Sequence, residues 1–123
     1  MKIQDFRIGN YISDDGDFAT IELINGEMEE ITYKGPKIYL TENLLYINPL
    51  DINEDSLTKI GFTKKFENKF NTSFMFNDIE YHIPKHGMNN SFLFYKRISF
   101  KIKYIHELQN IYYLIKGHEI TID

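Results

Sequence analysis

The sequence predicts a single α+β domain of 123 residues in which antiparallel strands predominate. Three observations favour this class: β-rich runs separated by tight-turn dipeptides in the first third, similar runs after one short helical segment, and one apolar stripe of helical period near the end. Aromatic residues make up 15% of the chain and supply a core without disulfides. We therefore expect a sheet-dominated fold with the C-terminal helix packed on the sheet.

The first third is predicted to form a β-meander. Its β-rich runs, residues 6–12, 18–24 and 27–33, are separated by Asp15-Gly16 and by Asn25-Gly26. Both dipeptides favour two-residue type I′ turns, whose central positions need positive φ. The runs at 37–40 and 44–47 are expected to extend the meander into a small SH3-like half-barrel.

A change of pattern near residue 50 predicts a short central helix followed by more strands. Asn53 is a good N-cap, acidic residues follow it in the first turn, and Gly61 suits the position after the helix, so we expect a helix over 54–60. Further strands are expected at 62–66, 73–76, 79–83 and 92–102, the last with a break near Lys96 and Arg97.

A C-terminal helix is predicted from apolar residues that recur with a period of 3.6. They are Ile105, Leu108, Ile111, Tyr112 and Ile115. Gly117 ends this helix, and residues 119–122 read as a final edge strand. A seam near residues 49–54 separates a lobe at 1–50 from a lobe at 51–123, but at this length we expect one core shared by residues 1–123.

Composition and charge exclude several classes of protein. The chain has no cysteine, which excludes disulfides, thiolate metal sites and a cysteine nucleophile. The charged segment Met1–Arg7 is unlike a signal peptide, and no apolar stretch approaches the roughly 20 residues that span a bilayer. We therefore expect a cytoplasmic protein without a membrane partner.

The histidines and aspartates give no metal-binding pattern. His82 and His86 are four residues apart, but Pro84 between them argues against the helix that would align them, so we interpret them as turn and loop residues. The aspartates at 14, 15 and 17 lack the spacing of a calcium loop and are explained by the hairpin turn. The sequence predicts no metal ion and no cofactor.

No catalytic motif is present either. His106 and Glu107 are neighbours on the predicted helix and point about 100° apart, so His106 is expected at the rim of that helix. We therefore predict a protein that is not an enzyme. A small enzyme whose site is assembled only by the fold is the alternative hypothesis.

The segment 92–103 alternates apolar and polar residues with the period of a strand. This places Phe92, Phe94, Ile98, Phe100 and Ile102 in the core and Tyr95, Arg97, Lys101 and Lys103 on one exposed face. Such a face suits a single-stranded RNA-binding module, since an aromatic ring stacks on a base and cations hold phosphates. A solvated sheet face whose lysines discourage edge pairing is the favoured interpretation.

Acidic residues gather in the first half of the chain. Residues 1–61 carry a net charge of −7 and residues 62–123 a net charge of +3. Glu27, Glu29 and Glu30 fall on one short predicted strand, which we interpret as an acidic face for a partner protein.

Three blocks of the sequence resemble a group of small proteins from phage and prophage regions, for which no activity is established. The blocks are Arg7-Ile8-Gly9-Asn10, Asn48-Pro49-Leu50 ahead of Leu57…Gly61-Phe62, and Lys103-Tyr104-Ile105-His106-Glu107-Leu108-Gln109-Asn110. The resemblance implies a fold-determining signature, in which Gln109 and Asn110 lie off the apolar stripe and cap or cross-link the backbone.

These observations lead to one functional hypothesis and two rivals. We expect a non-catalytic binding protein of a phage or mobile element that occludes a host protein or ribonucleoprotein, because inhibitors of host defence, anti-CRISPR proteins included, are typically small, acidic and free of motifs, as this chain is. The rivals are the RNA-binding module and the small enzyme described above.

Overall fold

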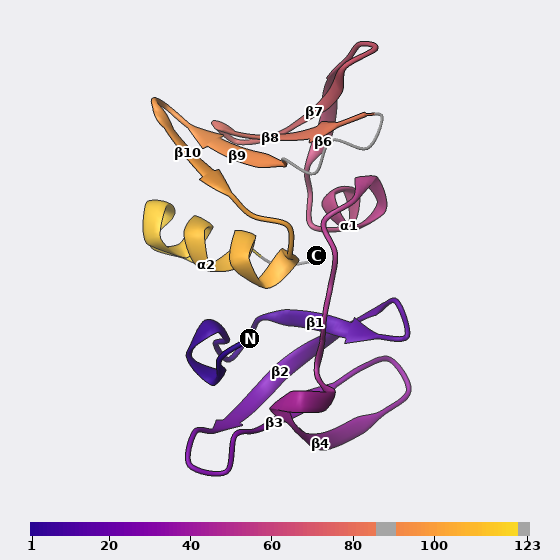
Figure 1. Cartoon of the computed structure of the whole chain (residues 1–123), viewed down its shortest axis with the longest axis vertical. Helices are drawn as coiled ribbons and strands as arrows, with labels where there is room; N and C mark the ends of the chain where they lie inside the picture. The colour runs from indigo at the N-terminus through magenta and orange to yellow at the C-terminus, as the bar shows by residue number, and fades with distance from the viewer. Residues whose placement is uncertain (86–90, 121–123) are drawn as a thin grey trace. The chain divides into compact units, whose positions relative to one another are not determined.

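The computed structural model describes residues 1–85 and 91–120 (Figure 1). The fold is α+β, as predicted, and divides into two compact units. The first contains Met1–Leu50 with Tyr104–His118, and the second contains Asp51–Lys103 with the chain end from Glu119. The C-terminal helix is therefore part of the same unit as residues 1–50.

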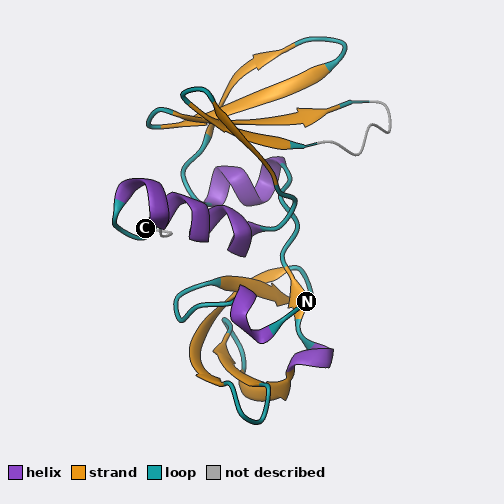
Figure 2. Cartoon of the chain, turned by 60° about the vertical axis from the view of Figure 1, so that its left-hand side comes forward, coloured by secondary structure: helices purple, strands orange, loops and turns teal. Residues whose placement is uncertain are grey.

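The first unit is built on a five-stranded antiparallel sheet that curls into a half-barrel (Figure 2). Its order is β4-β3-β2-β1-β5, with β1 (Tyr11–Asp14), β2 (Asp17–Asn25), β3 (Glu30–Lys34), β4 (Tyr39–Asn43) and β5 (Asn48–Pro49). The unit also has two short 3₁₀ helices. The first, η1 (Ile3–Asp5), precedes β1, and the second, η2 (Leu44–Tyr46), connects β4 to β5. Ile12, Ala19, Ile21 and Ile31 are almost fully buried on the inner face.

One of the two predicted tight hairpins is confirmed. Asp15 and Gly16 have φ of 50° and 89° and join β1 to β2 directly, as a type I′ turn requires. The turn predicted at Asn25-Gly26 is wrong, since residues 26–29 form a four-residue turn. Its positive φ lies at Glu29 (51°), and the Asn25 side chain accepts a hydrogen bond from the Met28 N–H (3.2 Å).

Two other predicted strands of this unit are also corrected. The segment 6–10 forms a turn, because the Asn10 side chain accepts a hydrogen bond from the Arg7 N–H (2.7 Å) and the Asn10 N–H donates to the Arg7 carbonyl (3.0 Å). Residues 44–46 form η2, because the Asn43 side chain caps it by accepting from the Leu45 N–H (3.0 Å). Local side-chain bonds to the backbone outweigh β propensity at both places.

The C-terminal helix α2 (Ile105–Lys116) packs against β1 and the preceding turn, and it ends at Gly117 as predicted. Ile105, Leu108 and Tyr112 are buried, whereas Ile111 and Ile115 are only partly buried. His106 is 2% exposed and stacks on Phe6, with 4.4 Å between ring centroids, so the predicted rim position is wrong.

Gln109 and Asn110, which lie off the apolar stripe, bond to the backbone near the start of the chain, as predicted. The Gln109 side chain accepts from the Tyr11 N–H (2.8 Å) and donates to the Gly9 carbonyl (3.1 Å). The Asn110 side chain donates to the Asp5 carbonyl (2.9 Å), and its oxygen accepts from Arg7 Nε (2.7 Å) and Asn10 Nδ2 (2.9 Å). The segment 5–11 and the helix residues Gln109 and Asn110 therefore meet in one polar contact, which we call the turn–helix contact.

The second unit combines α1 (Glu54–Lys59) with a five-stranded antiparallel sheet of order β10-β9-β8-β7-β6 (Figure 1). The strands are β6 (Thr63–Glu67), β7 (Asn71–Phe76), β8 (Ile79–Pro84), β9 (Phe92–Tyr95) and β10 (Ile98–Lys101). The predicted cap is confirmed, since Asn53 accepts from the Ser56 N–H (2.9 Å). Phe62, directly after α1, stacks on Phe76 of the sheet at 5.5 Å.

The expected strand at 92–102 is a hairpin, with its turn at the predicted break. Tyr95 pairs with Ile98 across a two-residue turn, in which Lys96 has φ of 54°. A two-residue turn places residues 95 and 98 on the same face, so the odd-even pattern reverses after it. Leu93 is therefore buried, while Phe94 lies on the outer face with 36% of its surface exposed.

The final strand expected at 119–122 is not formed by residues 119 and 120, and the rest of that segment lies outside the described residues.

Candidate functional site

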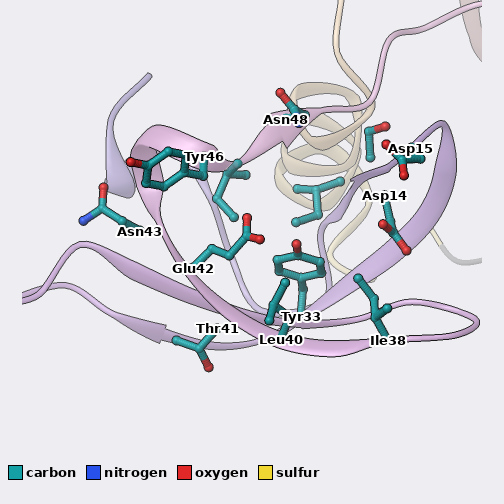
Figure 3. Close-up of a pocket in the computed structure, with 13 residues that line it drawn as sticks. Asp14, Asp15, Tyr33, Ile38, Leu40, Thr41, Glu42, Asn43, Tyr46 and Asn48 are labelled. Atoms are coloured by element: carbon teal, nitrogen blue, oxygen red, sulfur yellow. The ribbon is translucent and has the colours of Figure 1, made fainter.

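A pocket of about 550 Å³ opens along the seam of the half-barrel, where its sheet does not close (Figure 3). One wall comes from β1 and β5 and the other from β3 and β4, so both edge strands of the sheet contribute to it. Its polar residues are Ser13, Asp14, Asp15, Tyr33, Thr41, Glu42, Asn43, Tyr46 and Asn48. Neither lysine nor arginine lines this pocket, which is built entirely from described residues.

The strand register explains why polar groups reach the inside of the barrel. Ile31 is opposite Glu42, and Tyr33 is opposite Leu40, so all four side chains lie on the inner face of the sheet. The tyrosine is 6% exposed, with its hydroxyl directed into the pocket beside Glu42 (Figure 3). At the other end, the type I′ turn after β1 presents Asp14 and Asp15 to the same space.

The negative charge of this pocket acts on Tyr33. Burial raises the pKa of its hydroxyl above the ordinary value of 10.0, and the charge of Glu42, a hydrogen bond to that carboxylate and the charges of Asp14 and Asp15 raise it further. The hydroxyl therefore stays protonated at neutral pH and is a hydrogen-bond donor. The pocket thus combines three carboxylates with the apolar surfaces of tyrosine and isoleucine side chains. This lining suits a cationic group such as the ammonium of lysine on its aliphatic chain or the planar guanidinium of arginine.

Sequence reasoning missed Tyr33 and Glu42 and explained the two aspartates by the turn alone. For Tyr33 the available signal was the alternation of polar and apolar residues over 30–34. Residues 39–43 do not alternate, and Glu42 is placed on the inner face by its pairing with Ile31. The meeting of these strands with β1 and β5 depends on the curl of the sheet, for which no local sequence signal exists.

The predicted acidic face is not on one strand. Glu27 and Glu29 are exposed in the turn between β2 and β3, and only Glu30 belongs to β3. The reason is the four-residue turn described above, which shortens the predicted strand. None of the three glutamates lines the pocket.

The predicted basic face is also divided. Tyr95 shares a face with Leu93, whereas Lys101 is opposite Phe92 and lies on the other face. Arg97 is in the turn of the hairpin, and Lys103 follows β10. The hairpin, which the alternation alone does not reveal, separates these four residues.

A histidine and a carboxylate do meet, on the outer face of the second sheet. His82 Nε2 lies 3.1 Å from Glu80 Oε2, and Lys65 Nζ lies 2.7 Å from Glu80 Oε1. Lys65 and His82 hold the pKa of the Glu80 carboxyl below its ordinary value. Ser73 is opposite His82, but its hydroxyl donates to the Phe66 carbonyl (3.4 Å) and not to the imidazole. His86 lies outside the described residues.

No family model matches the chain, and no curated protein or solved structure matches it significantly. Within residues 1–85 and 91–120, no helix has the length and apolar character needed to cross a bilayer. Among the same residues, no three His, Asp or Glu side chains lie close enough together to hold one metal ion.

Proposed function

We propose that this chain is a non-catalytic binding protein whose half-barrel pocket takes a cationic side chain, lysine or arginine, from a partner protein. The observation that supports this most directly is the pocket lining: Glu42 lies beside the Tyr33 hydroxyl, Asp14 and Asp15 lie at the other end, and neither lysine nor arginine is among the lining residues. A cationic group entering the pocket would exchange water for carboxylate oxygens and bury its stem against Ile12 and Ile38.

The edge strand β4 supports the same proposal. Only one side of β4 is paired within the sheet, so its other side presents free backbone groups next to the pocket. An extended peptide that adds to this edge would place alternate side chains toward the inner face. A basic residue in such a peptide is thus held by backbone hydrogen bonds as well as by Glu42.

We further propose that the partner is a host protein or ribonucleoprotein bound by a protein of a phage or mobile element, acting in the bacterial cytoplasm. The support for this part is the sequence resemblance and the acidic, motif-free composition. Affinity capture from host lysate with and without ribonuclease, followed by mass spectrometry, tests it. Capture of nothing above a Glu42→Gln control would contradict it.

The pocket itself is tested by a nuclear magnetic resonance titration with small probes. N-acetylated, amide-capped arginine and lysine should shift the backbone amides of residues 13–15 and 41–43, and capped norleucine, which keeps the stem of lysine without its charge, should not. Glu42→Gln and Asp14→Asn should each weaken binding about five-fold or more, as expected for charge-assisted hydrogen bonds of at least 1 kcal/mol.

Glu22→Gln is the matched control for these variants. Glu22 is an exposed carboxylate of β2 that does not line the pocket, and its removal changes the net charge by the same amount. Equal shifts with norleucine, or equal weakening by Glu22→Gln, would refute the pocket as a specific cation site.

A further inference from the structure

The outer face of the second sheet carries aromatic and basic side chains side by side. In the register, Phe66, Ser73, His82, Phe92 and Lys101 form one row across all five strands. The next row on the same face contains Met75, Glu80, Phe94 and Ser99. We call Phe66, His82, Phe92 and Phe94, with Lys65 and Lys101, the aromatic face.

This face is separate from the core of its own unit. The opposite face of the same sheet buries Phe74, Tyr81 and Leu93 to 1% exposure or less. On the aromatic face, by contrast, Phe66 is 56% exposed and Phe94 is 36% exposed. Large aromatic side chains left at the surface of a sheet in this way indicate a binding surface.

The rings are close enough to act together. The centroids of Phe92 and Phe94 are 6.0 Å apart, and the His82 ring meets Phe94 edge to face at 4.8 Å. Because His82 is also fixed by Glu80, its ring and that of Phe94 are held in place before any ligand binds. Planar groups can therefore stack here with little loss of side-chain freedom.

The charge around these rings is positive. Glu80 is the one carboxylate in the two rows, and it is already paired with Lys65 and His82. Lys101, at the end of one row, is exposed and makes no ion pair in the part of the chain that is described. The turn that follows β9 adds Lys96 and Arg97 at the edge of the same hairpin.

We propose that the aromatic face binds single-stranded nucleic acid, with bases stacked on Phe94, Phe92 and Phe66 and phosphates held by Lys101 and the cations of the hairpin turn. Exposed aromatic rings on an open antiparallel sheet with flanking cations are the arrangement that binds unpaired bases. A protein partner with an apolar surface would gain nothing from the cations, so the charge favours the polynucleotide. This proposal goes beyond the proposed function, since it uses no residue of the pocket.

The test is fluorescence anisotropy with labelled twelve-nucleotide oligouridine and oligothymidine, at about 50 and 200 mM salt. Phe94→Ala and Phe66→Ala should each weaken binding roughly five- to a hundred-fold, the usual effect of losing one stacked base. Phe94→Tyr keeps a stacking ring and should bind nearly as tightly as the native chain. Lys101→Gln should lower the salt slope by about one.

Phe70→Ala is the matched control, because Phe70 is 65% exposed in the same unit but lies in the turn before β7, outside the aromatic face. Glu42→Gln should leave oligonucleotide binding unchanged, which separates this proposal from the pocket. Binding of RNA and of DNA both support the proposal, and their ratio tells which is preferred. Absence of binding at the lower salt, equal loss in Phe70→Ala, or equal affinity for a duplex of the same length would overturn it.

Discussion

Gln109 provides the sharpest test of how the two ends of the first unit are joined. Its side chain is fully buried, accepts a hydrogen bond from the Tyr11 N–H and donates one to the Gly9 carbonyl. Both partners lie about 100 residues earlier in the sequence. Gln109→Leu keeps an apolar stem of similar size but removes both partners. The buried Tyr11 N–H and the partly buried Gly9 carbonyl then lose this partner.

The expected cost follows mainly from the Tyr11 N–H, because the partly exposed Gly9 carbonyl can bond to water instead. A buried donor without a partner costs about 1–3 kcal/mol, and Gln109→Leu should reduce the free energy of unfolding by about that amount. Domains have a free energy of unfolding of about 5–15 kcal/mol, so this loss is a large part of the total. Leu114→Ala is the control on the same helix, since Leu114 is 82% exposed and its truncation should cost under about 0.5 kcal/mol.

Urea unfolding followed by circular dichroism measures the global effect, and hydrogen exchange of the Tyr11 amide reports on the contact itself. The Tyr11 amide should exchange faster in Gln109→Leu, and the urea midpoint should fall without a change in slope. A loss of stability no larger than that of Leu114→Ala, with unchanged protection of Tyr11, would refute the role assigned to the turn–helix contact.

Three further predictions concern stability and charge. Leu108→Ala should cost about 2–5 kcal/mol and the partly buried Ile111→Ala clearly less, as compared by urea midpoints; equal costs would contradict the burial difference. Burial lowers the pKa of His106, so on acidification the unfolded chain takes up the imidazole proton before the folded chain does. The free energy of unfolding should therefore fall as the pH drops below about 6.5, by up to roughly 1.4 kcal/mol per pH unit. Urea unfolding at several pH values measures this dependence, and His106→Phe should abolish it. Gly61→Ala should destabilise the protein by at least about 1–2 kcal/mol, because φ at this position is 108° and a Cβ would lie 2.9 Å from the Phe76 ring. Thermal unfolding measures this loss, and Gly26→Ala is the control because a Cβ at residue 26 would meet no atom within 4 Å.

The fold class could be predicted from signals that are local in the sequence. The cap at Asn53, the type I′ turn at Asp15-Gly16 and the apolar stripe with its stop at Gly117 each depend on residues a few positions apart, and each is present as predicted. Gln109 and Asn110, which lie off that stripe, bond to the backbone as expected.

The predictions of local structure failed for two reasons. Either a side chain bonded to the backbone a few residues away and replaced a strand by a turn or 3₁₀ helix, or a turn reversed which residues of a strand face the core. Asn10 and Asn43 convert expected strands into a turn and a 3₁₀ helix, and the two-residue turn at Lys96 moves Phe94 from the expected core to the outer face. Strand propensity and apolar–polar alternation do not predict these changes, since one or two hydrogen bonds decide each of them.

Both candidate sites were decided by tertiary structure alone. The pocket exists because the curl of one sheet brings β1 and β5 near β4, and the aromatic face exists because five strands align Phe66, His82 and Phe92 in one row. The sequence determined which residues are aromatic, acidic and basic, and how the strands alternate. It could not determine which of them meet, because pairing partners across a sheet are chosen by long-range packing and not by neighbours in the chain.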